Sequence, residues 1–347
     1  MESAFSEYTQ FALEKTMELL AIDSPTGYTT QAAEYVAAQF AALGCPVQTA
    51  VKGGVLAQLG GTGRDGLLLE AHADTLGGMV AEIKANGRLR IVNVGGLNAN
   101  NTEGENCRVV TKFRGVYEGT LQLVNASIHV NGDYNSTSRK FDVMEVVLDE
   151  VADTAEAVRA LGIEVGDFVC FDPRTHLTSS GYIKSRFLDD KLSVGILLAL
   201  AKYLRDKQIT PARPVYVHVT VFEEVGHGGA ASVPADVTEA ISVDMGCVGE
   251  GLQCTERQVS ICARDSGGPY HYEVVKGLIA AAQRAGADYA VDISPHSGSD
   301  GEATLSAGHD LRHGLIGAGV YASHGYERSH RDGVENTLKL LVSYLCG

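Results

Sequence analysis

The chain has no tryptophan and comparatively little positive charge. Its 347 residues include 28 Lys and Arg against 43 Asp and Glu, which gives a formal net charge of −15. This excess of negative charge disfavours binding to nucleic acid or to an anionic membrane surface, because both are negatively charged themselves. We therefore expect neither as a partner.

The cysteines and apolar residues also lack the patterns of disulfide frames, structural zinc sites and membrane spans. There are seven Cys, an odd number, and no two are spaced as CxxC. We interpret them as reduced thiols in a cytoplasmic protein. No run of 18 apolar residues occurs, and the first twenty residues are acidic and amphipathic, unlike a signal peptide.

Apolar strands alternate with helical segments in both outer parts of the sequence. Residues 5–20 and 29–43 carry apolar side chains at helical spacing, and strand-like runs follow, such as GLLLEAHAD, PVYVHVTVFEE and AISVDMG. The stretch YIKSRFLDDKLSVGILLALAKYLRDK indicates a short strand that leads into a long buried helix. This alternation predicts an α/β fold whose mostly parallel sheet is covered by helices on both faces.

The middle of the chain has a different pattern. Its strand-like segments are short, often alternate apolar and polar residues, and are separated by turn signals such as ANGR and VNGDYNS. We predict a small all-β, barrel-like domain over 76–177, inserted into an α/β domain formed by 1–75 and 178–347. The ends of such an insertion lie close together.

Polar side chains follow several of the predicted strands. Five segments end an apolar strand or open an apolar helix with His or carboxylate residues: His72 and Asp74, Asp189 and Asp190, Glu223 and Glu224, Asp244, and His324. Each segment alone has an ordinary explanation, such as a surface pair, a helix cap or a turn. Because open α/β sheets bind ligands outside the carboxyl ends of their strands, we expect these residues to meet at one rim.

Such a rim is chemically suited to metal ions. A buried, unpaired carboxylate is unfavourable, so neighbouring carboxylates require protons, cations or water. Two His with several carboxylates form a ligand set for zinc, cobalt or manganese. The set exceeds what one ion needs, and we therefore expect two ions about 3.5–4 Å apart that share a bridging Asp and a nucleophilic water.

The segments HAD, LDDK, FEEVGHGGA, VDMG and SHGYE resemble, in order and spacing, those of metallopeptidase family 42, the tetrahedral or glutamyl-type aminopeptidases. The resemblance covers nearly the whole chain, and FEEVG and LDD are its most specific parts. It implies an aminopeptidase with two metal ions, zinc first and cobalt or manganese as alternatives, acting on short peptides. The family's large hollow oligomers imply a homo-oligomer, such as a dodecamer, with the inserted domain serving assembly.

The resemblance also implies a role for each matching residue. Asp189 would bridge the two ions, and the remaining metal ligands would be His72, Glu224, Asp244 and His324. Of these, Glu224 and Asp244 would bind one ion each, and His324 would complete the second ion's shell. The peptide bond between Asp189 and Asp190 is expected to be cis, as in related enzymes.

Glu223 would be the general base in this scheme. It would take the proton of the attacking water and pass it to the leaving amine. Adjacent residues of an extended chain point to opposite sides, so Glu223 can face the water while Glu224 faces a metal. Asp74 lies on the same strand face as His72 and is expected to orient it.

The sequence departs from the commonest family pattern at two positions. Asp190 stands where Asn is usual, and Gly325 and Tyr326 follow His324 where Ser-Pro is usual. His330 is the alternative to His324 as the last ligand. The SHGYERSH variant resembles a bacterial subgroup associated with synthesis of the osmoprotectant N-acetylglutaminylglutamine amide.

The sequence also offers further candidate site residues and alternative functions. His296 and Asp300 are candidates for substrate contact, His227 for a role beside the paired Glu residues, and His309 and His313 for structural positions. A deacylase or carboxypeptidase with the same chemistry is the main alternative function. A glycosidase would need two carboxylates about 5–9.5 Å apart across a sugar, which neighbouring Glu residues do not obviously provide. A non-catalytic metal-binding protein would not need Glu223.

Overall fold

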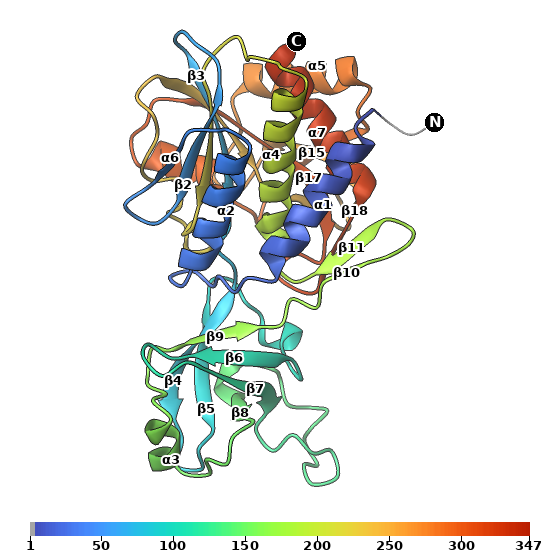
Figure 1. The fold of residues 1–347 in the computed structure, drawn as a ribbon. Helices are drawn as coiled ribbons and strands as arrows, with labels where there is room; N and C mark the ends of the chain where they lie inside the picture. Colours follow the sequence, from blue (N-terminus) through green and yellow to red (C-terminus); the bar gives the residue numbers. More distant parts are fainter. Residues whose placement is uncertain (1–3) are drawn as a thin grey trace. The chain divides into compact units, whose positions relative to one another are not determined.

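A computed structural model describes residues 4–347 (Figure 1). The chain forms two compact units. The first runs up to Asp74 and resumes at Arg174, and the second comprises Thr75–Pro173. All of the predicted metal ligands belong to the first unit. Among the described residues, no helix is long and apolar enough to cross a bilayer.

The first unit is built on one twelve-stranded sheet. Its main path runs β1-β2-β12-β3-β13-β17-β18-β11-β10, while β14 and β15 pair with β17, and β16 pairs with β15. The strands are β1 Val47–Thr49, β2 Val55–Gly60, β3 Gly66–His72, β10 His176–Leu177, β11 Tyr182–Ser185, β12 Val215–Thr220, β13 Val237–Val243, β14 Gly246–Val248, β15 Val259–Arg264, β16 Tyr289–Ile293, β17 Arg312–Tyr321 and β18 Glu327–His330.

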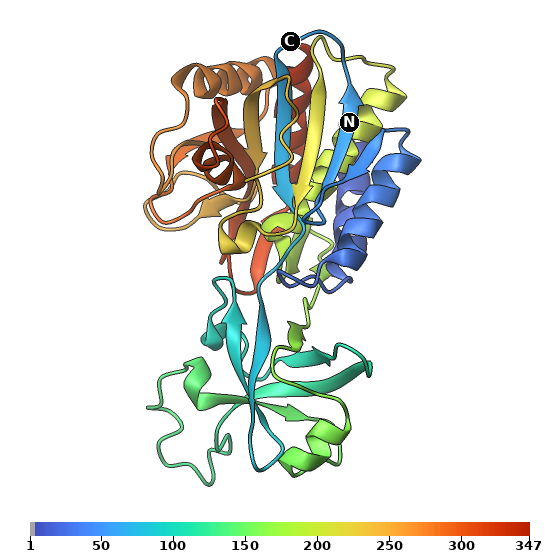
Figure 2. The same ribbon diagram turned by 90° about the vertical axis from the view of Figure 1, so that its left-hand side faces the viewer.

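The centre of this sheet is parallel and its outer strands are largely antiparallel. Strands β12, β3, β13 and β17 pair in parallel, whereas β2 and β18 join them in the antiparallel sense. Every residue of β3 is buried, which is the pattern of a strand covered on both faces. Figure 2 shows helices on both sides of the sheet. The predicted α/β class is confirmed, with a sheet that is mixed at its edges.

The helices of the first unit are α1 Ser6–Leu20, α2 Thr30–Ala42, α4 Leu188–Asp206, α5 Tyr272–Ala285, α6 Asp300–Ser306 and α7 Arg331–Cys346. Helix α4 is buried over most of its length, and it packs against β3, α1 and α7. Gly195 permits its close approach to α1, because a Cβ there would lie 2.2 Å from the Thr16 hydroxyl oxygen. The long apolar run in the sequence is thus explained by burial between the sheet and two helices.

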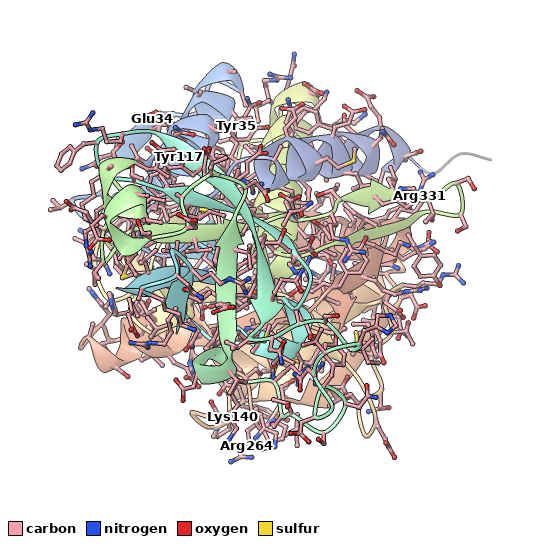
Figure 3. All side chains as sticks on the ribbon, turned by 90° about the horizontal axis from the view of Figure 1, so that it is seen from below. Glu34, Tyr35, Tyr117, Lys140, Arg264 and Arg331 are labelled. Atoms are coloured by element: carbon pink, nitrogen blue, oxygen red, sulfur yellow. The ribbon has the colours of Figure 1, made fainter. Side chains whose placement is uncertain are left out.

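The second unit is a closed antiparallel barrel, as predicted. Its strand order is β4-β5-β8-β7-β6-β9. The elements are β4 Gly77–Ile83, β5 Leu89–Val94, β6 Asn106–Val110, β7 Val116–Leu123, β8 Met144–Leu148, α3 Ala155–Ala160 and β9 Phe168–Phe171. Alternate residues such as Ile91, Val109 and Leu121 fill the interior. Tyr117 on β7, labelled in Figure 3, donates its hydroxyl to the Leu161 carbonyl oxygen at 2.7 Å.

The register of the central strands brings their carboxyl ends to one edge of the sheet. His72 pairs with Thr220, which are the last residues of β3 and β12, and Val243, the last residue of β13, pairs with Ile316 on β17. Segments that follow these strands therefore start from the same edge. This edge is where the candidate site lies.

Candidate metal centre

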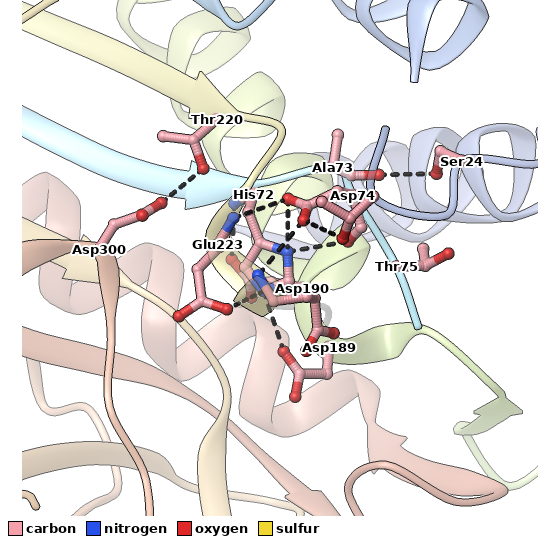
Figure 4. A network of polar contacts seen from close by, with 12 residues as sticks. Ser24, His72, Ala73, Asp74, Thr75, Asp189, Asp190, Thr220, Glu223 and Asp300 are labelled. Atoms are coloured by element: carbon pink, nitrogen blue, oxygen red, sulfur yellow. Dashed lines mark hydrogen bonds and ion pairs between the residues drawn. The ribbon is translucent and has the colours of Figure 1, made fainter. Parts of the chain in front are cut away.

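His72 ends β3 and is almost fully buried. Its Nδ1 atom lies 2.9 Å from the backbone carbonyl oxygen of Asp74. A carbonyl oxygen can only accept, so Nδ1 carries the proton and donates. The Nε2 atom is then the nitrogen available to a metal, and it faces the carboxylates of the site (Figure 4).

The carboxylate of Asp74 holds the segment that carries the paired Glu residues. It accepts hydrogen bonds from the backbone N–H groups of Glu223 at 3.2 Å and Glu224 at 3.3 Å, and from the Thr26 hydroxyl at 2.7 Å. Asp74 therefore does more than orient His72, the role expected from the sequence. It fixes the backbone of Glu223 and Glu224 relative to that histidine.

Glu223 and Glu224 do not lie on an extended strand, and that expectation was wrong. Strand β12 ends at Thr220, and Glu223–Val225 form a single 3₁₀ turn. Alternation along a strand therefore does not separate the two side chains. They still face different partners: Glu223 Oε2 lies 3.6 Å from His72 Nε2, and Glu224 Oε2 lies 3.6 Å from His324 Nε2.

Asp189 lies between the two histidines. Its Oδ1 atom is 3.2 Å from His72 Nε2, and its Oδ2 atom is 3.6 Å from His324 Nε2. The peptide bond between Asp189 and Asp190 is cis, as predicted. Both residues have non-helical backbone angles at the start of α4. A carboxylate with one oxygen toward each histidine has the arrangement of a ligand shared by two ions.

The remaining donors are also gathered here. Donor atoms of His72, Asp189 and Glu224 lie within 4.8 Å of one another, and so do those of His72, Asp190 and Asp244. Burial, reinforced by the Asp189 carboxylate, raises the pKa of Asp244 to about 8. The same two causes raise the pKa of Glu224 well above its ordinary value. Carboxylates so crowded and buried favour bound cations, and the donor set fits two divalent ions.

Asp190 is also a member of this cluster, and the sequence analysis placed it at the rim but not among the metal ligands. It is fully buried, and its Oδ2 atom accepts from the backbone N–H of His72 at 3.3 Å. Within the described chain, its Oδ1 atom has no hydrogen-bond partner. Burial, and then the nearby Asp244, raise the pKa of Asp190 well above its ordinary value.

The alternative ligand His330 is engaged elsewhere. Its Nδ1 atom accepts from the N–H of Asp332 at the start of α7, and its Nε2 atom lies 2.9 Å from the Ser180 carbonyl oxygen. His324 instead lies beside Asp189 and Glu224. The geometry therefore favours His324 as the last ligand.

The remaining polar candidates from the sequence lie in different surroundings. His296 lines the cavity of the site, whereas Asp300 is buried and accepts from the Thr220 hydroxyl at 2.5 Å and the Gly229 N–H at 2.6 Å. His227 is exposed and stacks on Phe222. His313 packs against the ring of Tyr270, and His309 is partly buried after α6.

The cluster of candidate metal ligands borders a cavity of about 600 Å³. Its acidic wall contains Asp189, Glu223, Glu224 and Asp244, and the rest of its lining includes Met245, Leu252 and Pro295. A space of this size accommodates a few residues of an extended ligand.

Replacing Asp74 by Asn is expected to lower kcat by roughly 10–100-fold, as loss of a group that orients metal ligands typically does. The two backbone N–H groups of the Glu223–Glu224 turn bond to different oxygens of Asp74, and Asn replaces one of these oxygens with an NH₂ group that can only donate. Steady-state kinetics with metal analysis tests this. The exposed Asp65→Asn variant is the control and should be unchanged. Wild-type kcat in the Asp74→Asn variant would contradict the role of Asp74.

The fold and the cluster together define a class, the metal-dependent hydrolases with an α/β catalytic unit. Comparison with known proteins narrows it. A model of the M42 glutamyl aminopeptidase family matches residues 53–340. YhfE of Bacillus subtilis strain 168, a candidate aminopeptidase, is 42% identical over 341 residues, which cover 96% of this chain and 98% of that protein.

Solved structures share the fold. The TET1 peptidase of Pyrococcus horikoshii, described as assembling into a tetrahedron or a large octahedral shell, has a TM-score of 0.84 at 21% identity, covering 96% of this chain and 99% of that one. A PhTET1 structure described as a dodecamer has a TM-score of 0.83 at 20% identity, covering 96% of this chain and 98% of that one.

The chain belongs to the M42 glutamyl aminopeptidase family. The predicted enzyme class, a hydrolase of the metallo-aminopeptidase type, is confirmed.

Proposed function

We propose that this chain removes N-terminal residues from short peptides with two divalent metal ions and with Glu223 as the general base. One observation carries the proposal: the two oxygens of the Asp189 carboxylate face two different histidines, His72 and His324. That arrangement supports a bridging ligand. Membership in an aminopeptidase family supports the reaction.

The ligands divide into two sets that share Asp189. His72 and Asp244 would hold one ion with it, and Glu224 and His324 would hold the other. Zinc is the metal that we propose, with cobalt and manganese as alternatives for the same donor set. When bound, such ions polarise a carbonyl group and lower the pKa of water.

Three observations support Glu223 as the group that moves the proton of the attacking water. Its carboxylate lines the cavity, and its backbone is held by Asp74. Burial raises the pKa of Glu223 well above its ordinary value, so its carboxylate is a stronger base than an exposed one. Glu223 accepts the water proton and delivers it to the nitrogen of the leaving peptide.

Membership in an aminopeptidase family supports cleavage at the amino end, where the free amine of the substrate would bind one of the two ions. Three of the four carboxylates that line the cavity are proposed metal ligands, so bound ions would offset their negative charge. The C-terminus of a substrate is a carboxylate, and none of the described residues that line the cavity is Lys or Arg. The described lining thus offers no Lys or Arg to bind that carboxylate, which favours the aminopeptidase over a carboxypeptidase. An assay on free and N-acetylated peptides distinguishes a deacylase from an aminopeptidase.

The solved structures support a proposal about assembly. The P. horikoshii TET1 peptidase is described as assembling into a tetrahedron or a large octahedral shell, and we propose that this chain also forms a homo-oligomer, such as a dodecamer, in the cytoplasm. The osmoprotectant association rests on the SHGYERSH variant alone and stays a prediction.

A matched pair of peptide panels tests the function. The protein, loaded with zinc, cobalt or manganese, is assayed on peptides with free N-termini and on the same peptides N-acetylated. We expect cleavage of the free panel alone, and loss of activity on chelation. Cleavage of only the acetylated panel would replace the aminopeptidase with a deacylase or an endo-acting enzyme, and it would strengthen the osmoprotectant association.

A further inference from the structure

Glu327, the first residue of β18, is a buried carboxylate that contacts the backbone of two predicted metal ligands. Its Oε1 atom accepts from the N–H of His324 at 2.9 Å, and its Oε2 atom accepts from the N–H of Asp189 at 3.1 Å. Its side chain is 2% exposed. One side chain therefore ties together two ligand-bearing segments that are far apart in the sequence.

We propose that Glu327 is a positioning residue that sets the separation of Asp189 and His324, and thereby the affinity of the site for its second ion. This inference rests on the proposed dinuclear site, in which these two residues and Glu224 hold that ion. It goes beyond the ligands themselves, because Glu327 is not among the predicted metal ligands and acts on two of them through their backbone N–H groups.

The topology explains why this position is suited to the role. Strand β18 lies between β11 and β17 in the sheet. Strand β11 leads into the segment with Asp189, and β17 leads into the segment with His324. Glu327 pairs with Ser185 at the end of β11, and Arg328 pairs with Tyr321 at the end of β17. Its side chain therefore starts from a fixed point between the two segments.

Both ligands lie on irregular backbone, where strand pairing does not fix their positions. His324 has a φ of +62°, in the left-handed region, and lies between the strands β17 and β18. Asp189 has non-helical angles at the start of α4. By contrast, His72 ends β3, and Asp244 directly follows β13. The second ion thus depends on ligands that need an additional support, and the carboxylate of Glu327 provides it.

Glu327→Gln is the variant that tests this inference. The amide keeps the shape of the side chain but offers one acceptor oxygen, so one of the two N–H groups loses its partner. We expect the affinity for the second ion to fall by roughly 10–100-fold. The affinity for the first ion should fall less, because only Asp189 among its ligands contacts Glu327, while His72 and Asp244 are held at strand ends. Calorimetric titration of metal-free protein with zinc measures both affinities, and thermal melting of the metal-free protein is recorded alongside.

Glu239→Gln is the matched control. Glu239 is also a buried carboxylate, and it pairs with Arg213 and Arg312. It lies near the start of β13, whereas the predicted ligand Asp244 follows the end of that strand. Its variant should bind both ions like the wild type. Glu327→Asp keeps the charge but is one methylene shorter and reaches only one N–H. The Glu327→Asp variant should also lose affinity for the second ion, and it replaces Glu327→Gln in the experiment if the Gln variant does not fold.

The outcomes separate this inference from the proposed function. Wild-type protein that binds fewer than two ions per chain would contradict the dinuclear site itself. If the wild type binds two ions and the Glu327 variants bind both with unchanged affinity, the positioning role is wrong. A lower melting temperature of the metal-free variants with unchanged affinities would likewise overturn it, because it would show a purely structural role.

Discussion

Replacing Glu223 by Gln is expected to lower peptide hydrolysis by roughly 10²–10⁴-fold or more while both metal ions remain bound. The amide is nearly isosteric with the carboxylate but cannot accept the proton of the attacking water. Glu223 belongs to neither ligand set, so its loss should leave the metal content unchanged. Metal analysis of the purified variant and its kcat on a cleaved peptide check the two halves of this prediction.

The neighbouring residue offers a control for Glu223→Gln. Glu224 precedes Val225 in the same 3₁₀ turn, and its backbone N–H is held by the same Asp74 carboxylate. Glu224→Gln should instead weaken binding of the ion that Glu224 shares with His324. The two adjacent Glu→Gln substitutions would thus lower activity for different reasons, the first through loss of the base and the second through loss of a metal ion. A Glu223→Gln enzyme that stays active would show that the base has been misassigned.

Replacing Asp189 by Asn is expected to have the second large effect, the loss of high-affinity binding at both metal positions. Asp189 is the only predicted ligand that both sets share, and a neutral amide is a far weaker ligand than a carboxylate. Activity should fall with the metal content, and excess zinc should restore little of it. Inductively coupled plasma mass spectrometry after dialysis, together with kcat, measures this result.

Asp190→Asn is the matched control for Asp189→Asn. Asn is the usual residue of the family pattern at this position, and its amide oxygen can accept the hydrogen bond that the Asp190 side chain accepts from the His72 backbone. The Asp190→Asn variant should therefore keep two ions and most of its activity. Because donor atoms of Asp190 also lie near His72 and Asp244, loss of one ion in this variant would show that Asp190 is itself a ligand.

The sequence predicted the part of the site that follows from strand ends. His72 and Asp244 could be placed at one edge because buried parallel strands end together, and the observed register of β3, β12 and β13 brings these ends together. The barrel was predictable for a related reason. Its segments are short and alternating, and turn residues separate them, whereas central strands of the larger sheet such as β3 are buried along their whole length.

The supports of the site could not be predicted in the same way. Glu327 and Asp74 act by accepting hydrogen bonds from backbone N–H groups, which nearly every residue carries, so no residue pattern reveals the partner. The 3₁₀ turn at Glu223 was missed because VYVHVTVFEE continues to look like a strand beyond Thr220. Asp74 accepts hydrogen bonds from two N–H groups of this turn, and these bonds join segments about 150 residues apart in the sequence.

The central claim is that Asp189 bridges two metal ions beside Glu223. A crystal structure of the zinc-loaded protein, with anomalous scattering recorded at the zinc absorption edge, tests it most directly. We predict two anomalous peaks about 3.5–4 Å apart on either side of the Asp189 carboxylate, with Glu223 bound to neither ion. A single ion at this site, or two ions that do not share Asp189, would contradict the account.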